Sequence, residues 1–180
     1  MDERLKGIFI IVASLAVPIL ALLNYEAIAS YEWKSMGYFG VFLVMLISDA
    51  SIIFPLPGLA IATVLGAFSN PLIVAVAGGV GGTIGELTGY FAGYGGSIIA
   101  DGKRKEMYEK IKGKLAERHA GVIAIFTLAA IPNPFFDIAG LAAGAIRYPL
   151  WKFLLACSLG KIIKIAMFAY FGLFAIDFIL

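Results

Sequence analysis

Histidine and cysteine are almost absent from this chain of 180 residues, because each occurs once, at His119 and Cys157. A single histidine cannot complete a HExxH-type zinc site, and a single cysteine cannot form a disulfide within the chain. Charged residues are also scarce, at 14% against about 25% in soluble domains, and the net charge is only +2. The composition therefore gives no support to metal chemistry, to a disulfide scaffold or to a nucleic-acid partner.

Apolar residues take the place of the missing polar ones. They make up 61% of the sequence, and the mean hydropathy is +0.94. These values are typical of an integral membrane protein, and a chain of this length has room for about four to six spans of roughly 20 residues. We expect one multi-pass domain in the cell membrane, with membrane lipids as partners and with a homo-oligomer as a further form.

The charge distribution divides the chain into regions. Residues 1–35 are expected to form an uncleaved transmembrane helix, kinked at Pro18, and an outer loop, because no cleavage site for a signal peptide follows. Residues 36–180 form the main membrane domain, with a first repeat at 36–99, an amphipathic segment at 100–120 and a second repeat at 121–180. Between Asp101 and His119, seven Lys and Arg residues outnumber four acids, which predicts a cytoplasmic location.

Each repeat contains a Pro-X-Pro motif inside an apolar run. A proline lacks a backbone N–H and disfavours helical geometry in the residue before it, so both runs should break into hairpins. We predict two re-entrant hairpins, each followed by a long transmembrane helix, inserted with opposite topology as in inverted-repeat transporters. The residues at the two breaks are Pro55, Pro57, Gly58, Pro132, Asn133 and Pro134.

Ionisable residues within the apolar segments are the candidate site, because each costs about 2.5 to 3.5 kcal/mol at the bilayer centre and so faces a partner or water. They are Asp49, Glu86, Asp137, Lys161 and Lys164, with Arg147 just outside. Lys161 and Lys164 are three residues apart on one helix face, which we predict to turn toward Asp137 or Asp49. The functional interpretation is a proton or cation relay, and the plainer one is a set of static ion pairs. Glu86 could also bond Thr83 or Tyr90, and Arg147 could simply mark the membrane interface.

Glycines recur at spacings of three and four in the run expected to form a helix from Leu72 to Ile99. Such a stripe lets helices approach closely in lipid, and helix packing is the favoured interpretation. A phosphate-binding loop is a poor alternative, because no lysine or serine follows at the required spacing. The stripe consists of Gly78, Gly82, Gly85, Gly89 and Gly93, with Gly96 beyond it.

Several of these pieces, in this order, resemble the DedA family, whose shared region is also called the VTT or SNARE-associated domain. The resemblance covers about Gly40 to Gly172. Its pieces are Asp49 before Pro55 and Pro57; the run GELTGYFAG from Gly85 to Gly93; Pro132 followed by Ala139 and Gly140; and Phe153 and Gly160 near and within the last helix. The resemblance implies opposed re-entrant hairpins, essential membrane acids with basic partners, and a role in moving lipids or ions.

Bacterial members of that family are linked to proton-dependent functions and to flipping of polyprenyl-phosphate lipids, and eukaryotic relatives scramble phospholipids. Many bacterial members carry arginines near the second break, where this chain has Asn133 and Phe135. The basic role then falls to Lys161, Lys164 or Arg147.

From residues and resemblance together we expect a transporter that moves a lipid with an anionic head group between leaflets. A proton-coupled solute transporter and a non-transporting scaffold are the alternatives. An enzyme is not expected, nor is a cofactor, because the chain offers no set of nucleophile and base. Asp49 and Asp137 also lack the glycine-x-glycine-aspartate setting of intramembrane aspartyl proteases.

Overall fold

The computed structural model of the chain describes residues 4–9, 11–12, 37–50, 58–99, 106, 113, 120–132 and 136–179. Within these ranges the regular elements are α-helices and no strand occurs, which confirms the predicted all-α class. Several predictions fall outside the described residues: the kink at Pro18, most of the N-terminal helix, most of the amphipathic segment, and the breaks at Pro55, Pro57, Asn133 and Pro134.

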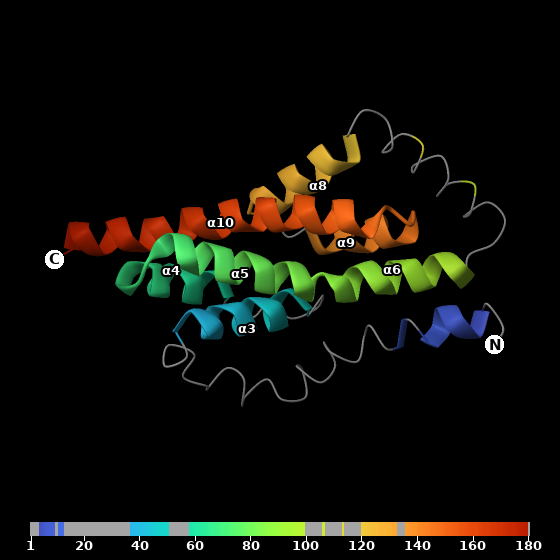
Figure 1. Ribbon diagram of the computed structural model, residues 1–180, viewed down its shortest axis with the longest axis horizontal. Helices are drawn as coiled ribbons and strands as arrows, with labels where there is room; N and C mark the ends of the chain where they lie inside the picture. Colours follow the sequence, from blue (N-terminus) through green and yellow to red (C-terminus); the bar gives the residue numbers. More distant parts are fainter. Residues whose placement is uncertain are drawn as a thin grey trace.

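Two long helical stretches run antiparallel along the whole molecule (Figure 1). The first consists of α5 (Pro71–Gly85) and α6 (Leu87–Ile99), which lie end to end, and the second is α10 (Leu150–Ile179). Both are long and apolar enough to cross a membrane, over Pro71–Ile99 and Leu150–Ala175.

Glu86 is the single turn residue between α5 and α6. Its N–H donates to the carbonyl of Gly82, and its own carbonyl accepts from the N–H of Tyr90, so the helical hydrogen bonding continues through the junction. The sequence predicted one uninterrupted helix from Leu72. The observed stretch begins one residue earlier, at Pro71. Asn70 caps it by accepting from the N–H groups of Leu72 and Ile73, and proline is well suited to the first helical position.

Four shorter helices accompany the long ones. They are α3 (Gly37–Ala50), α4 (Gly58–Phe68), α8 (Ala120–Ala130) and α9 (Phe136–Ala145). Each has 10 to 14 residues, and at 1.5 Å per residue it is shorter than the hydrocarbon core of a bilayer, about 30 Å thick. The interruption predicted at Pro132 is present, since α8 ends at Ala130 and Pro132 is not helical.

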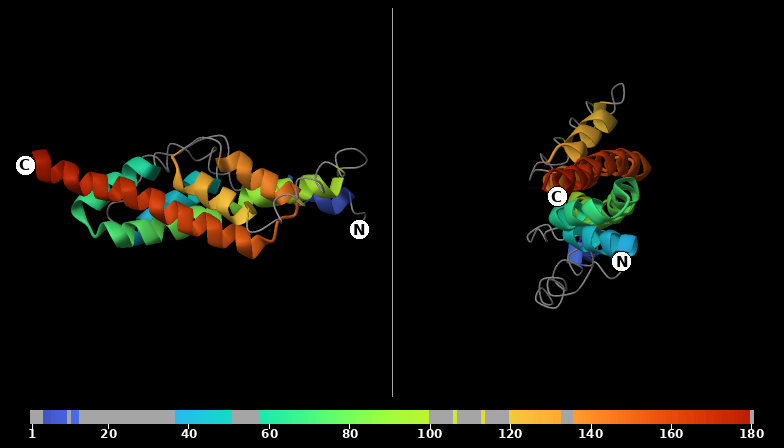
Figure 2. Two further views of the ribbon diagram at one scale, coloured as in Figure 1. Left: turned by 90° about the horizontal axis from the view of Figure 1, so that it is seen from above. Right: turned by 90° about the vertical axis from the view of Figure 1, so that its left-hand side faces the viewer.

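The packing of these helices repeats in the two halves of the chain. The first short helix of each half lies on the long stretch of its own half, α3 on α5 and α8 on α10. The second short helix crosses to the long stretch of the other half, α4 to α10 and α9 to α6. In the end-on view of Figure 2, α8, α10, α5 and α3 follow one another across the molecule.

Glycines stand where helices touch through their backbones. A methyl group added at Gly81 or Gly85 would overlap backbone atoms of α3, and one added at Gly93 would overlap the carbonyl of Leu141 in α9. Gly144 of α9 lies equally close to the carbonyl of Tyr90. Within the stripe, Gly85 therefore receives α3 and Gly93 receives α9, so different parts of one stripe contact different helices.

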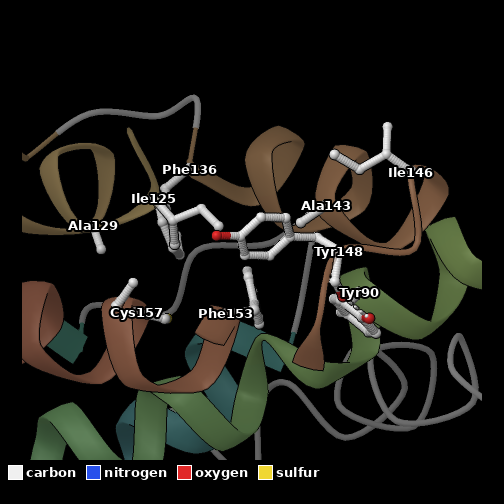
Figure 3. Packing of buried hydrophobic residues seen from close by; sticks show 10 residues of the cluster. Tyr90, Ile125, Ala129, Phe136, Ala143, Ile146, Tyr148, Phe153 and Cys157 are labelled. Carbon is white, nitrogen blue, oxygen red and sulfur yellow. Dashed lines mark hydrogen bonds between the residues drawn. The ribbon is translucent and has the colours of Figure 1, made fainter. Parts of the chain in front are cut away.

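Buried apolar side chains form two clusters. One joins the two short helices of the first half to α5 and α10, and includes Val41, Leu65 and Ile165. The other joins α8, α9 and α10 to Tyr90 of α6, and includes Phe136, Phe153 and Cys157 (Figure 3). On α10, Cys157 belongs to one cluster and Ile165 to the other. Lys161 lies between them, four residues from each.

The hinge between α9 and α10 is docked on α6. The hydroxyl of Tyr90 donates to the carbonyl of Tyr148, and the Tyr90 ring packs 5.2 Å from the ring of Phe153 (Figure 3). Both tyrosines are about 5% exposed, so this hydrogen bond replaces a contact with water.

We expect Tyr90→Phe to lower the free energy of unfolding by about 1 to 3 kcal/mol, because the buried carbonyl of Tyr148 loses its partner. Unfolding in detergent, followed by circular dichroism against denaturant, measures the change. The matched control is Tyr170→Phe on the exposed face of α10, which should stay within about 0.5 kcal/mol of the wild type. Equal stability of the two variants would contradict the assigned role of the hydroxyl.

Candidate functional site

A buried lysine paired with two carboxylates lies at the centre of the molecule. The Nζ atom of Lys161 is 2.6 Å from Oδ2 of Asp49 and 2.9 Å from Oε1 of Glu86, and it donates a hydrogen bond to each. Lys161 is 1% exposed, Glu86 2% and Asp49 18%. Charge-assisted hydrogen bonds of this length are strong, and the cluster offsets much of the cost of removing three charges from water.

Three separate elements supply this triad. Asp49 lies in the last turn of α3, Glu86 at the junction of α5 and α6, and Lys161 near the middle of α10. A carboxylate at a helix C-terminus is opposed by the helix dipole, so Asp49 gains from an adjacent cation. Gly82 makes room for it, because a methyl group there would overlap Oδ2 of Asp49.

The ring of Phe136 is the third neighbour of the lysine. Nζ of Lys161 lies 5.0 Å from the ring centroid, in the range of a cation–π contact, and Phe136 is 3% exposed. Phe136 is the first residue of α9, so the start of the second half's crossing helix touches the triad. No sequence pattern singles out this aromatic, because only the fold brings it over Lys161.

Asp137 and Lys164 flank the triad. Lys164 is 8% exposed, and Asp137 lies in the first turn of α9, where a negative charge is favoured by the helix dipole. Both lie within electrostatic range of Lys161 and Asp49. In the described part of the chain, neither forms an ion pair with another residue, so the lysine face meets Asp49 and Glu86 rather than Asp137.

Glu86 does not bond Thr83 or Tyr90, the two partners considered from the sequence. Its carboxylate meets Lys161, whereas Thr83 donates to the carbonyl of Gly79 and Tyr90 to that of Tyr148. Both hydroxyls find backbone acceptors, which leaves Glu86 for the lysine of another helix.

Arg147 lies away from the other charges. It is in the hinge before α10, where its Nε donates to Oγ of Ser97 at 3.0 Å and its guanidinium lies over the ring of Tyr94 at 5.4 Å. Ser97 is eleven residues beyond Glu86 along the helix, about 16 Å at 1.5 Å per residue. Arg147 is therefore not part of the central cluster.

Two residues of the predicted breaks, Gly58 and Pro132, are among the described residues. Gly58 begins α4 and is buried, and a methyl group there would meet Sδ of Met45 at 2.7 Å. Pro132 is exposed after the end of α8.

In the stripe, Gly78 faces Ile165 of α10, and Gly89 contacts the backbone of α9. In α9, Gly140 was named only as part of the family resemblance and Gly144 was not predicted, although their spacing of four is the same packing signal.

Polar and apolar side chains are distributed as in a protein surrounded by lipid. The charged residues Glu86, Lys161 and Lys164 are buried, whereas large apolar side chains lie on the outside. One face of α10 exposes a row of them at spacings of four: Leu155, Leu159, Ile163, Met167 and Phe171. Such a surface would be costly in water and is expected in hydrocarbon. The fold and the site define an α-helical membrane protein with a buried ion cluster.

The chain matches the family model of the VTT domain over residues 56–174. It belongs to the VTT domain family, as the resemblance to DedA proteins implied. Relatives include vacuole membrane protein KMS2 of Arabidopsis thaliana, which is 36% identical in an alignment 107 residues long; this alignment covers 51% of this chain and 26% of that protein.

The Dictyostelium discoideum vacuole membrane protein 1 homolog is 32% identical in an alignment 122 residues long, which covers 55% of this chain and 30% of that protein. Human vacuole membrane protein 1 is 34% identical in an alignment 114 residues long, which covers 53% of this chain and 28% of that protein. The matched region thus spans about a quarter to a third of these relatives. No solved structure matches the chain significantly.

Proposed function

We propose that this protein moves a phosphate-bearing lipid between the two leaflets of a membrane. The observation that carries the proposal is the buried cluster at the meeting point of the two halves. Lys161, which pairs with two acids, and Lys164, which has no ion pair among the described residues, lie there on one face of α10. Ionisable groups inside a membrane protein are maintained at a cost, and transport pathways are where they are usually found.

The arrangement of helices supports an alternating path. The four short helices lie in pairs, and each pair is followed by one long stretch, with the same packing pattern in both halves. We interpret the pairs as two re-entrant hairpins of opposite topology, with segment 100–120 in the cytoplasm. In such inverted repeats the site lies where the interrupted helices meet, and Asp49 and Phe136 are at the ends of interrupted helices here.

The charges of the cluster suggest how a head group would be held. Asp49 and Glu86 both engage Lys161, so Lys164 is the cation that remains for a phosphate. Among the acids of the cluster, Asp137 has no ion pair in the described part of the chain, so it is the acid that remains for a cation or proton. Because the cluster has three acids and two lysines, the head group's own charge matters, and an anionic and a zwitterionic lipid should be compared.

Lipid exchange in reconstituted vesicles tests the proposal. Lipids with a fluorescent acyl chain and either a glycerol or a choline head group are incorporated, and a membrane-impermeant quencher reports the fraction that reaches the outer leaflet. We expect exchange at least about tenfold faster with wild-type protein than in empty vesicles. Lys164→Gln and Asp137→Asn should remove most of the gain, because each deletes one remaining charge. Lys152→Gln, at the start of α10, is the matched control.

The same assay separates the other functions. Exchange equal to that of empty vesicles for both head groups would overturn the lipid proposal. Solute uptake driven by a pH gradient, without lipid exchange, would instead identify a proton-coupled solute transporter. Neither activity, together with reduced stability of the charge variants, would identify a scaffold whose charges are static pairs.

A further inference from the structure

We infer that Arg147 is a surface docking site for the phosphate of a lipid head group, separate from the central cluster and placed where the lipid first meets the protein. This inference rests on the proposed function and adds a second, peripheral contact to it. Four observations carry it: how the side chain is held, what it leaves unpaired, its backbone conformation and its position along the membrane span.

The guanidinium of Arg147 is fixed by groups of α6. Its Nε donates to Oγ of Ser97, and the hydroxyl of Ser97 in turn donates to the carbonyl of Tyr94, whose ring lies beneath the guanidinium. Ser97 is 9% exposed, whereas Arg147 is exposed. The inner edge of the guanidinium is thus attached to the protein while the rest of it faces outward.

The outward part keeps its hydrogen-bonding capacity. A guanidinium has five N–H donors in a planar fork, and only the Nε–H is used by a described side chain. Within the described ranges no carboxylate pairs with Arg147. Two parallel N–H groups at a fixed angle match two oxygens of a phosphate, and fixing the fork beforehand reduces the entropy lost on binding.

The backbone shows that arginine is not the residue that the turn itself favours. Arg147 has φ +53°, the only non-glycine residue with positive φ in the described part of the chain. Its N–H closes the end of α9 on the carbonyl of Gly144, and glycine is the usual residue at this kind of helix end. A left-handed arginine is retained at a conformational cost, which points to a use for its side chain.

The hinge also lies at the proper level for a head group. The membrane-crossing stretch of α10 begins at Leu150, three residues later, and Trp151 is 62% exposed beside Lys152, whose Nζ is 5.5 Å from the indole centroid. Tryptophan and lysine at the start of a span are typical of the interface between hydrocarbon and water. Lipid phosphates are found at this level.

Quenching of Trp151 fluorescence tests the inference. The full chain with Trp33→Phe leaves Trp151 as the only tryptophan and is reconstituted into vesicles containing a lipid with a nitroxide on its phosphate head group. We expect half-maximal quenching to need about tenfold more labelled lipid in Arg147→Gly than in the Trp33→Phe parent, since a charge-assisted contact is lost. Lys152→Gln, which removes a neighbouring interfacial cation, should change the amount of labelled lipid needed for half-maximal quenching less than twofold.

Thermal unfolding of the same proteins separates docking from a structural role. If Arg147 docks the phosphate, Arg147→Gly weakens quenching while its midpoint is equal to or above that of the parent, because glycine relieves the positive φ. Unchanged quenching in Arg147→Gly would overturn the inference. A weakened response in Arg147→Gly and Lys152→Gln alike would also overturn it, by showing general surface charge. Lipid exchange by the wild type is measured separately, so a failure of the proposed function is recognised independently.

Discussion

Replacing Lys161 with methionine is expected to lower the free energy of unfolding by about 3 to 5 kcal/mol, the range measured when one partner of a buried ion pair is removed. Lys161→Met keeps most of the volume and the apolar contacts of the side chain, so the loss is electrostatic. Asp49 and Glu86 would remain as two buried carboxylates without a cation at 2.6 and 2.9 Å. Denaturant titration in detergent, followed by circular dichroism, measures the change.

Two further variants make this result specific. Lys152→Met, on the same helix but at its interfacial start, should stay within about 0.5 kcal/mol of the wild type. The triple variant Lys161→Met, Asp49→Asn, Glu86→Gln should recover most of the lost stability, because it removes the carboxylates that lack a partner. If the single variant were as stable as the wild type, the triad would not hold the three helices together.

The second large effect is expected at Gly93. An added methyl group at this residue would overlap the backbone carbonyl of Leu141, and a backbone atom cannot turn aside as a side chain can. Gly93→Ala should therefore push α6 and α9 apart and cost about 1 to 3 kcal/mol, as overpacking usually does.

Gly96 provides the control on the same helix. Nothing lies within 4 Å of a methyl group added there, so Gly96→Ala should gain up to about 1 kcal/mol from the better helix propensity of alanine. The two variants carry the same substitution three residues apart and should have opposite signs in denaturant titration. A loss of similar size in both would show that helix propensity or flexibility, and not contact with α9, decides the outcome.

Local features of the fold could be predicted from the sequence because they depend on neighbouring residues. Pro132 predicted the end of a helix, and the long helix expected after the second break is observed at Leu150–Ile179. The glycine spacing indicated a helix in close contact with others. It could not indicate that one end of the stripe receives α3 and the other α9, because that depends on how the two halves cross.

The candidate site could be predicted only as a set of charges. Spacing placed Lys161 and Lys164 on one face, but two acids remained as partners, and Glu86 was not among them. Asp49 and Lys161 are 112 positions apart, so their pairing depends on the packing of α3 and α10 around α5. The cation–π contact with Phe136 depends in the same way on where α9 begins.

The contact between α6 and α9 has a consequence for motion. Gly93 and Gly144 bring the two backbones together, so the two surfaces are smooth at these positions. Smooth surfaces resist separation, which would expose backbone to lipid, but they offer little resistance to sliding along the helix axis. A shear of α9 on α6 would carry Phe136 past Lys161 without repacking the contact itself. Small displacements of α9 along α6 would thus change the surroundings of the buried charges.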